Sequence, residues 1–317
     1  MSIVVLAPGM LSSVQDHGRC GWRHLGVGRS GALDSLSFSI ANRLVGNATD
    51  MAVIEITLTG PRLRFAESAR IAICGARIDA SLDGQSLPGW RRIDIPAASE
   101  LHFGACRSGV RAYLAVAGGF LVNSVLDSQS TDLRAGFGGI EGRALKADDQ
   151  LIIGDGFRPQ CDQVNIDTRW IDPAPDLDFS NPSIIRVLPG SDALDDDDAL
   201  FADKWTVGNA SNRQGLRLQG TPLRIADPRE RISEPVLPGT LQLPSDGQPI
   251  LLLADAQTHG GYPRIGHVIR ADWPRLAQLR PGDALRFVRC GARQAQQLLN
   301  EQRQRLARMA IAIAADA

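Results

Sequence analysis

The sequence predicts a mainly β protein made of two tandem domains. Short apolar runs bounded by glycine and proline recur along the chain, and such runs are typical of strands. A length of 317 residues favours two domains over one. Residues 161–182 are rich in Asp, Pro and Asn and show no sustained period. We therefore expect domains at residues 1–160 and 183–317, joined by a linker.

The first domain is predicted to contain one helix among strands. Residues 3–6 form the expected first strand, which Pro8-Gly9 ends. Asp34 is placed to cap a helix at 35–45, whose apolar residues fall on one face and which Gly46 follows. Further strands are expected at 52–57, 63–65, 70–74 and 111–117, with a hairpin turn at Asp83-Gly84.

A polar loop precedes the predicted helix. It carries a carboxylate, an amide, two histidines and three arginines: Asp16, Gln15, His17, His24, Arg19, Arg23 and Arg29. A loop that leads into a helix N-terminus favours anions, because amide N–H groups there are unpaired and the helix dipole adds positive charge. The alternative is that the arginines are solvated and the histidines bridge loops. Glycine-rich residues 136–143 lack the spacing of a dinucleotide fingerprint and are predicted to be a shaped loop.

The densest group of polar side chains lies in the second domain, at residues 255–263. This stretch follows a predicted buried strand at 249–254 and carries Asp255, Gln257, Thr258, His259 and Tyr262. A structural turn needs the two glycines and Pro263, but it does not need that density of polar groups. The stretch is therefore a candidate site. The alternative is a turn whose polar groups satisfy their own backbone.

Four short patterns recur in the same order in both halves. Residues 3–9 resemble 184–190, 60–65 resemble 220–225, 118–120 resemble 260–262, and 145–151 resemble 279–285. The order predicts an internal duplication of a β-rich unit. Helices are also expected from Asp195, over 273–279, and in the tail from Ala292.

Composition excludes several classes of function. A net charge of −1 gives no electrostatic reason to bind nucleic acid or an anionic membrane. No run approaches the roughly 18 apolar residues of a membrane span, and the first residues do not resemble a signal peptide. Five cysteines without a CxxC pair predict reduced thiols in a cytoplasmic protein and no zinc or other metal site. A GxxxxGK[ST] phosphate loop is absent from the sequence.

A set of short motifs is spread over nearly the whole chain: residues 14–19, 30–34, 41–47, 55–58, 114–119, 130–133, 138–143, 211–213, 238–244 and 255–263. On these stretches the chain resembles the family of biotin-dependent carboxyltransferases, also called allophanate hydrolase subunit 2 or KipA-like proteins. Leu33, Gln129 and His259 stand where the family pattern has Met, Arg and Thr, and the His259 departure falls inside the candidate site.

The resemblance implies a fold of two cyclophilin-like β-barrels with a few short helices, and it implies two chemistries. The first is that of one component of ATP-dependent 5-oxoprolinase, which opens 5-oxoproline to glutamate only in complex with a KipI-like partner (the B subunit) and a LamB/YcsF-like partner (the A subunit). ATP would then be bound on, or shared with, a partner. The alternative is transfer of a carboxyl group from biotin, carried by another chain, to urea or a similar amide. A second alternative is a KipA-like regulatory binding protein.

Either chemistry acts on an unreactive amide and needs charge stabilised on oxygen and a positioned proton carrier. We expect Gln257 and Thr258 to orient the amide and His24 or Asp16 to handle protons. We expect substrate binding by Gln15, Arg19, Ser30, Ser211, Asn212, Arg213, Gly261 and Tyr262, with the segments 15–30, 211–213 and 257–262 converging on one cleft. A phosphorylated lactam carries a phosphate and a carboxylate, so the arginines Arg19, Arg23, Arg29 and Arg213 favour 5-oxoproline opening over carboxyl transfer.

Overall fold

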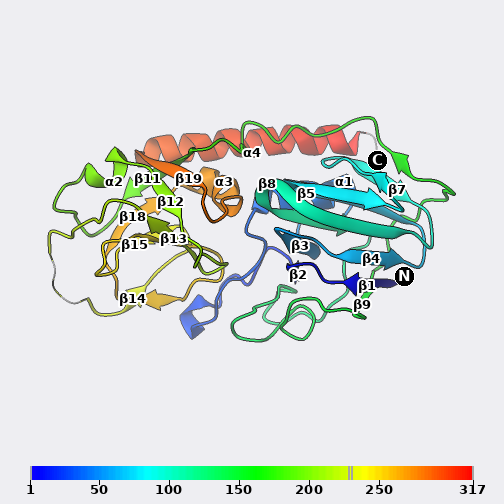
Figure 1. Ribbon diagram of the computed structural model, residues 1–317, viewed down its shortest axis with the longest axis horizontal. Coiled ribbons are helices and arrows are strands. Elements are labelled where there is room, and N and C mark those ends of the chain that lie inside the picture. Colours follow the sequence, from blue (N-terminus) through cyan, green and yellow to red (C-terminus); the bar gives the residue numbers. More distant parts are fainter. Residues whose placement is uncertain (1, 228, 230, 316–317) are drawn as a thin grey trace. The chain divides into compact units, whose positions relative to one another are not determined.

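The computed structural model describes residues 2–227, 229 and 231–315, which form two compact units (Figure 1). Unit 1 runs from the N-terminus to Arg19, from Ser30 to Pro173, and from Leu306 onward; unit 2 holds Cys20–Arg29 and Ala174–Arg305. The division after Pro173 falls inside the expected linker. Two short pieces are exchanged relative to the expected domains, because loop residues 20–29 lie with unit 2 and the end of the chain lies with unit 1.

Unit 1 is built on a ten-stranded sheet. Its centre is a pair of long antiparallel strands, β5 (Ala69–Leu82) and β8 (Glu100–Val116). The sheet order is β10-β7-β5-β8-β4-β1-β9, and β2 joins through β3, which pairs with β8. The other strands are β1 (Ser2–Ala7), β2 (Leu11–Gln15), β3 (Val53–Thr57), β4 (Arg62–Phe65), β6 (Gln85–Ser86), β7 (Arg92–Ile95), β9 (Gln150–Ile152) and β10 (Asn165–Ile166).

The helix predicted in the first domain is α1 (Ser35–Leu44), and its cap is confirmed. The Asp34 carboxylate accepts a hydrogen bond from the Ser37 amide at 3.0 Å. Leu36, Ile40 and neighbouring apolar residues are buried against side chains of β5 and β8, and the opposite side of the strands carries the larger apolar core of the unit. The predicted hairpin is also confirmed, because Leu82 pairs with Gln85 across Asp83-Gly84.

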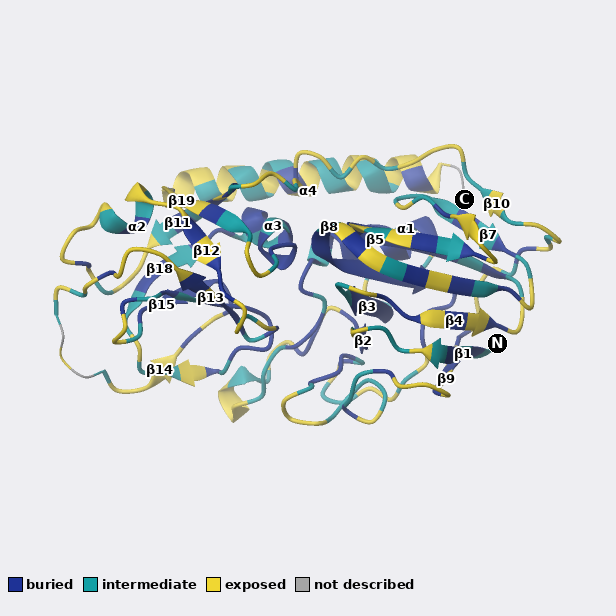
Figure 2. Ribbon diagram, in the orientation of Figure 1, coloured by how far each residue is buried: buried dark blue, intermediate teal, exposed yellow. Residues whose placement is uncertain are grey.

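Unit 2 is a closed barrel with the strand order β11-β18-β15-β16-β13-β12-β19. Buried and exposed residues alternate along strands such as β13 and β19, as expected when one face lines a core (Figure 2). The barrel strands are β11 (Ser183–Pro189), β12 (Trp205–Val207), β13 (Gly215–Gln219), β15 (Thr240–Gln242), β16 (Ile250–Leu252), β18 (Arg264–Val268) and β19 (Ala284–Arg289). The remaining short elements are η1 (Arg23–Leu25), α2 (Ala199–Ala202), β14 (Glu234–Pro235), β17 (His259–Gly260), η2 (Arg270–Asp272) and α3 (Trp273–Ala277).

The predicted C-terminal helix is α4 (Ala292–Ala314), and each unit contacts a different part of it. In unit 2, Ala295 and Leu298 pack against the cluster of Ile269, Ala271 and Cys290. In unit 1, the later residues Leu306, Met309 and Ile313 pack with the α1 cluster. Among the residues described, none of the helices combines the length and the apolar composition that a membrane crossing requires.

A mainly β fold is confirmed, but the internal duplication predicted from the four recurring patterns does not hold for the pairing of the strands compared. Strand β1 pairs with β9 in antiparallel fashion, whereas the corresponding β11 pairs with β19 in parallel. Residues 62–65 form strand β4, whereas the corresponding 222–225 contribute a single bridge at Ile225. The sequence patterns recur because short strands and their turns have similar chemistry, and similar chemistry does not fix how strands pair.

Candidate functional site

In unit 1, Asp16 is the centre of a buried hydrogen-bond cluster. Its side chain is held by four donors: the Gly18 amide at 2.7 Å, the Ser128 hydroxyl at 2.7 Å, the Ser130 hydroxyl at 2.5 Å and the Gln129 amide at 2.6 Å. Asp16 is only 3% exposed. A carboxylate in this setting ties loops together, so the geometry favours a positioning role for Asp16 over proton transfer.

Gln15 and Arg19 extend this Asp16 cluster, and both bind backbone. The Gln15 amide nitrogen donates to the Thr131 carbonyl at 3.2 Å, and its oxygen accepts from the Gly31 amide at 3.1 Å. Arg19 donates to the carbonyls of Val125 at 3.2 Å and Ser130 at 2.6 Å. Its guanidinium also lies 4.5 Å from the centre of the Phe137 ring, in the predicted glycine-rich loop. These side chains therefore shape loops of unit 1.

Ser30 lies at the edge of this region and differs from the others. It adopts a positive φ of 54° and is 1% exposed. Its hydroxyl is buried without a hydrogen-bond partner among the described residues. Ser30 therefore differs from Gln15 and Arg19, because its side-chain hydroxyl can still form a hydrogen bond with a ligand.

In unit 2, a buried ion pair fixes the stretch that follows β16. Arg213 donates to Asp255 in bidentate fashion, at 2.8 Å from Nε and 3.1 Å from Nη2, and the Asp255 amide donates to the Arg213 carbonyl at 3.1 Å. Both side chains are 5% exposed. The guanidinium face expected to bind a substrate carboxylate is thus engaged by Asp255. The pair instead holds the turn at 211–213 against the candidate stretch at 255–263.

Between these segments lies a cavity of about 130 Å³ that is rich in side-chain amides. We name it the carboxamide cavity. Ile250 and Leu252 of β16 supply apolar wall, and Tyr262, which is 51% exposed, supplies a phenol. The polar residues that complete the lining are Asn212, Gln214, Arg217, Gln242 and Gln257, together with Gly215. Three of the expected site residues, Asn212, Gln257 and Tyr262, therefore meet at one cavity.

Two glutamines define the polar part of the carboxamide cavity. Gln257 Nε2 donates to Gln242 Oε1 at 3.2 Å. Gln242 is 1% exposed, and its own Nε2 is buried with no hydrogen-bond partner in the described part of the chain. A β-carbon at Gly260 would lie 2.6 Å from Gln242 Nε2 and 3.5 Å from Gln257 Nε2, so only glycine leaves room beside both nitrogens. An unsatisfied buried donor is costly, and a ligand acceptor would remove that cost.

The other expected residues of unit 2 lie around this centre. Thr258 is buried, and its hydroxyl lies 3.0 Å from His259 Nδ1. Ser211 caps the turn by accepting from the Arg217 amide at 3.0 Å. His24 is exposed on η1, with Nδ1 2.8 Å from the Gly21 carbonyl. The neighbouring Arg23 donates to the Gln257 carbonyl at 3.1 Å, which joins the 20–29 segment to the candidate stretch.

The structure therefore brings together only part of the site that was expected from the sequence. Segments 20–29, 211–213 and 257–262 all lie in unit 2, whereas Gln15, Asp16, Arg19 and Ser30 lie in unit 1, so their convergence stays a prediction. Gln242, Gln214 and Arg217 were not identified as site residues. The signal that could have found Gln242 is its side-chain amide between two leucines, Leu241 and Leu243.

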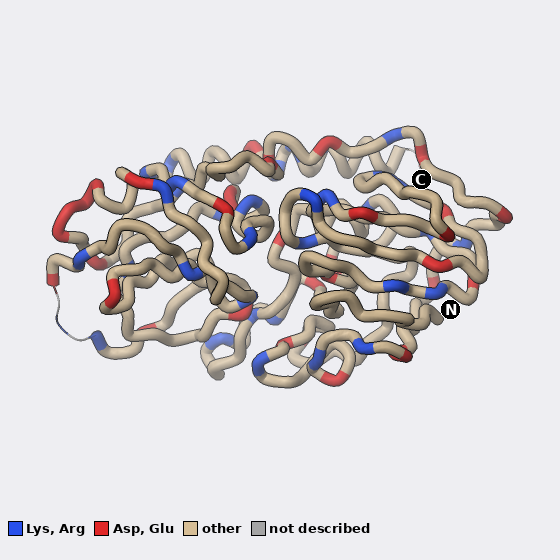
Figure 3. The backbone as a smooth tube through the Cα atoms, viewed as in Figure 1, with Lys and Arg blue, Asp and Glu red and all other residues tan. Residues whose placement is uncertain are grey.

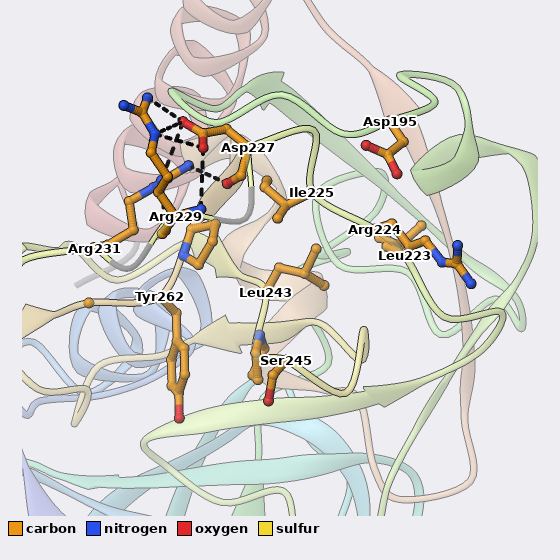
Figure 4. A pocket seen from close by; sticks show the side chains of 13 residues that line it. Asp195, Leu223, Arg224, Ile225, Asp227, Arg229, Arg231, Leu243, Ser245 and Tyr262 are labelled. Atoms are coloured by element: carbon orange, nitrogen blue, oxygen red, sulfur yellow. Dashed lines mark hydrogen bonds and ion pairs between the residues drawn. The ribbon is translucent and has the colours of Figure 1, made fainter.

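Gly261 and Tyr262 also line a larger cavity of about 710 Å³, shown in Figure 4. Two of its arginines already have carboxylate partners: Arg229 pairs with Asp227 at 2.6 Å, and Arg231 pairs with Asp192 at 2.8 Å. A hydrogen bond from the Arg229 guanidinium lowers the pKa of the partly exposed Asp227 to about 2. Both of these guanidiniums are already engaged by carboxylates, so the carboxamide cavity is the stronger candidate.

Comparisons with known proteins match most of the chain to one family and its relatives. Residues 25–289 match the family described as carboxyltransferase domain, subdomain A and B. The chain is 41% identical over 309 residues to the 5-oxoprolinase C subunit of Escherichia coli (strain K12), covering 94% of this chain and 96% of that protein. It is 32% identical over 306 residues to urea amidolyase of Saccharomyces cerevisiae, covering 90% of this chain but 16% of that protein. The solved structure of Kluyveromyces lactis urea carboxylase has a TM-score of 0.88 and 31% identity, covering 97% of this chain and 29% of that one.

Proposed function

Because the chain belongs to the carboxyltransferase-domain family, subdomains A and B, we propose that it serves as the C subunit of an ATP-dependent 5-oxoprolinase. The observation that carries the proposal is the match to the 5-oxoprolinase C subunit over 96% of that protein's length. In urea amidolyase the matching region is a small part of a much larger chain. The reaction proposed is the opening of 5-oxoproline to glutamate.

The carboxamide cavity supports an amide substrate. A lactam presents one carbonyl acceptor and one N–H donor side by side, and a side-chain amide presents the complementary pair. Gln242 Nε2, buried and without a partner in the described chain, is suited to donate to the lactam oxygen. Asn212 and Gln257 line the same space and are suited to bind the lactam N–H and orient the ring. Donors at the carbonyl oxygen also stabilise the negative charge that develops there during ring opening.

The roles proposed for the other expected site residues follow from their exposure and their hydrogen bonds. His24 is exposed on η1 and is proposed as the proton carrier, since Asp16 is enclosed by four donors. Thr258 is proposed to hold the 257–259 backbone through its contact with His259. Gly261 is proposed at the margin of the substrate site, and Ser211 supports Asn212 through the turn.

Partner proteins complete the proposal. ATP supplies the phosphoryl group that makes the lactam carbon electrophilic. We place ATP on, or shared with, a partner, because the sequence lacks a GxxxxGK[ST] loop. The partners proposed are the KipI-like B subunit of 5-oxoprolinase and its LamB/YcsF-like A subunit, in a cytoplasmic complex. The single chain is accordingly expected to be almost inactive.

One alternative rests on a specific observation. The urea carboxylase and urea amidolyase structures share the fold of this chain over nearly its full length. The same carboxamide cavity would accept urea, which is also a donor and acceptor in one plane. In that reaction biotin, carried on another chain, would supply the carboxyl group. A KipA-like regulatory role would need no turnover at all.

Reconstitution separates these functions. The purified chain is combined with the partner proteins encoded beside it and assayed for glutamate release with and without ATP, 5-oxoproline, bicarbonate and avidin. We expect release that depends on ATP and 5-oxoproline and that avidin does not change. Activity that requires bicarbonate and is abolished by avidin would show carboxyl transfer instead. Binding of the partners without any turnover would favour the regulatory role.

A further inference from the structure

Three neighbouring strands of the unit 2 barrel, β13, β16 and β15, place one residue each in a row along the carboxamide cavity. Arg217 of β13 pairs with Ile250 of β16, and Gln242 of β15 pairs with the same Ile250. All three residues line the cavity. Their neighbours Leu216 and Leu251 are at most 2% exposed, and successive side chains of a strand point to opposite faces. The row therefore lies on the face of the strands opposite to Leu216 and Leu251.

This row separates a charged group from an amide by one apolar residue. Neighbouring strands lie about 4.8 Å apart, so the backbones at Arg217 and Gln242 are separated by roughly 10 Å, with Ile250 between them. Both are long side chains, and both line the same cavity of about 130 Å³. One small ligand over Ile250 can therefore contact the guanidinium and the carboxamide at the same time.

Arg217 is the one charged residue among the described residues that line the carboxamide cavity. Its side chain is exposed and makes no ion pair within the described part of the chain, whereas the guanidinium of Arg213 is bound by Asp255. The backbone of Arg217 is held on both sides: its amide donates to the Ser211 hydroxyl at 3.0 Å, and its carbonyl accepts from the Gly208 amide at 2.7 Å. The base of the side chain is thus fixed, while the guanidinium stays available to a ligand.

We infer that Arg217 binds a carboxylate of the substrate and so selects amides that carry a carboxylate close to the amide nitrogen. The identity of that amide as 5-oxoproline rests on the proposed function. In 5-oxoproline the carbonyl and the carboxylate are attached to the two carbons that flank the lactam nitrogen. Gln242 Nε2, a buried donor without an acceptor in the described chain, takes the carbonyl oxygen. Ile250 contacts the ring, and the guanidinium takes the carboxylate through two parallel hydrogen bonds.

The same arrangement distinguishes the two candidate substrates. A cavity of about 130 Å³ is small beside the roughly 300–1,000 Å³ of sites for drug-sized ligands, so either 5-oxoproline or urea is of a suitable class of size. Urea is neutral and has no group for a guanidinium to bind as an ion pair. The family resemblance assigned substrate binding to Arg213, but Asp255 engages that residue, so Arg217 takes over the role of carboxylate recognition.

Ligand binding to the purified full chain tests this role without turnover. The probes are 5-oxoproline and 5-oxoprolinamide, which has the same ring but a neutral carboxamide in place of the carboxylate. Ligand-observed NMR titration gives both dissociation constants. We expect the wild type to bind 5-oxoproline at least about tenfold more tightly than 5-oxoprolinamide, because a hydrogen bond between two charged groups is lost in the amide. Arg217→Gln should bind the two ligands equally, with unchanged affinity for 5-oxoprolinamide.

Two variants serve as controls. Arg286→Gln removes the same charge from an exposed arginine on β19 that does not line the cavity, and it should bind both ligands as the wild type does. Gln242→Leu should weaken both ligands by the same factor, since both present the lactam carbonyl. Added potassium chloride should weaken 5-oxoproline binding to the wild type but not to Arg217→Gln. The melting temperature of Arg217→Gln should match that of the wild type, because the side chain is exposed.

Several results would overturn the inference. Equal affinity of the wild type for the two ligands, or no detectable binding of 5-oxoproline, would show that the cavity does not recognise a carboxylate. Equal affinity of the wild type and Arg217→Gln for 5-oxoproline would make Arg217 a solvated surface group. An equal loss in Arg286→Gln would show a general effect of net charge. Failure of the reconstituted complex to release glutamate would reject the proposed reaction and leave the binding comparison on the single chain standing.

Discussion

The Asp16 cluster of unit 1 and the carboxamide cavity of unit 2 are built from similar polar side chains, yet they use them in opposite ways. The four donors that contact the Asp16 side chain all bind its carboxylate. In the carboxamide cavity, Gln242 Nε2 has no acceptor among the described residues. Charged groups are spread over both units (Figure 3), so net charge does not distinguish the two regions. The two regions differ instead in whether a buried donor is left without an acceptor.

The largest effect on stability is expected from Asp16→Ala. The substitution removes the acceptor of four buried donors, and a change of this kind costs about 3–5 kcal/mol of unfolding free energy. Urea denaturation measures the loss, and hydrogen exchange of β2 and β3 locates it in unit 1. Asp50→Ala, at an exposed loop position, is the control. A loss below about 1 kcal/mol would place Asp16 among functional rather than structural groups.

The opposite behaviour is expected from Gln257→Ala. Gln257 is half-buried and its side chain has one hydrogen bond, to Gln242, so unfolding free energy should change by no more than about 1 kcal/mol. Activity of the reconstituted complex should fall about 100-fold, equivalent to roughly 2.7 kcal/mol of transition-state stabilisation.

Gln219→Ala, an exposed glutamine on β13, should change neither quantity and serves as the matched control. If Gln257→Ala instead destabilised the protein as Asp16→Ala does, the comparison between the two regions would fail. The polar stretch at 255–263 would then be a turn that satisfies its own backbone.

The sequence predicted the elements of each unit better than their pairing. Strand and turn signals are local, so β1, the capped helix α1 and the Asp83-Gly84 hairpin could be predicted from neighbouring residues. Whether β11 pairs with β19 in parallel or antiparallel fashion depends on residues about a hundred positions apart. Recurring local patterns therefore suggested a duplication that strand pairing does not support.

The candidate site shows the same limit. Gln257 and Tyr262 were found because polar residues are dense beside a buried strand, and Asn212 was found through the family resemblance at residues 211–213. Gln242 was missed because it is a lone amide in a short buried strand. Asp16 and Arg19 have the residue types of a catalytic site, and only packing shows that carbonyls, amides and hydroxyls already engage them.

A smaller effect on activity and almost none on stability is expected from Gln242→Leu. The substitution removes a buried donor that has no partner among the described residues, and leucine fills a similar volume. It also removes the acceptor of Gln257 Nε2, so the two contributions to unfolding free energy should cancel within about 1 kcal/mol. Activity should fall about tenfold, because one donor to the substrate carbonyl is lost. A melting temperature several degrees lower, with normal activity per folded molecule, would mean that Gln242 belongs with the saturated groups.

The smallest effect is expected from pH, and it should appear in unit 2. Burial lowers the pKa of His267 below its ordinary value of 6.5. The groups around its ring are the Thr240 hydroxyl, 3.3 Å from Nδ1, and the Gly239 segment with the Trp273 indole; Arg270, which stacks on that indole, adds a positive charge nearby. The unfolded chain therefore binds a proton more readily than the folded one, so this contribution to stability is complete above pH 6.5 and is lost as the pH falls toward the folded pKa.

Hydrogen exchange of β15 and β18 should accelerate over that range, relative to the same strands in His267→Gln, while β5 and β8 of unit 1 serve as an internal reference. Identical pH dependence in the wild type and in His267→Gln would show that burial of this imidazole has no measurable effect on the stability of unit 2.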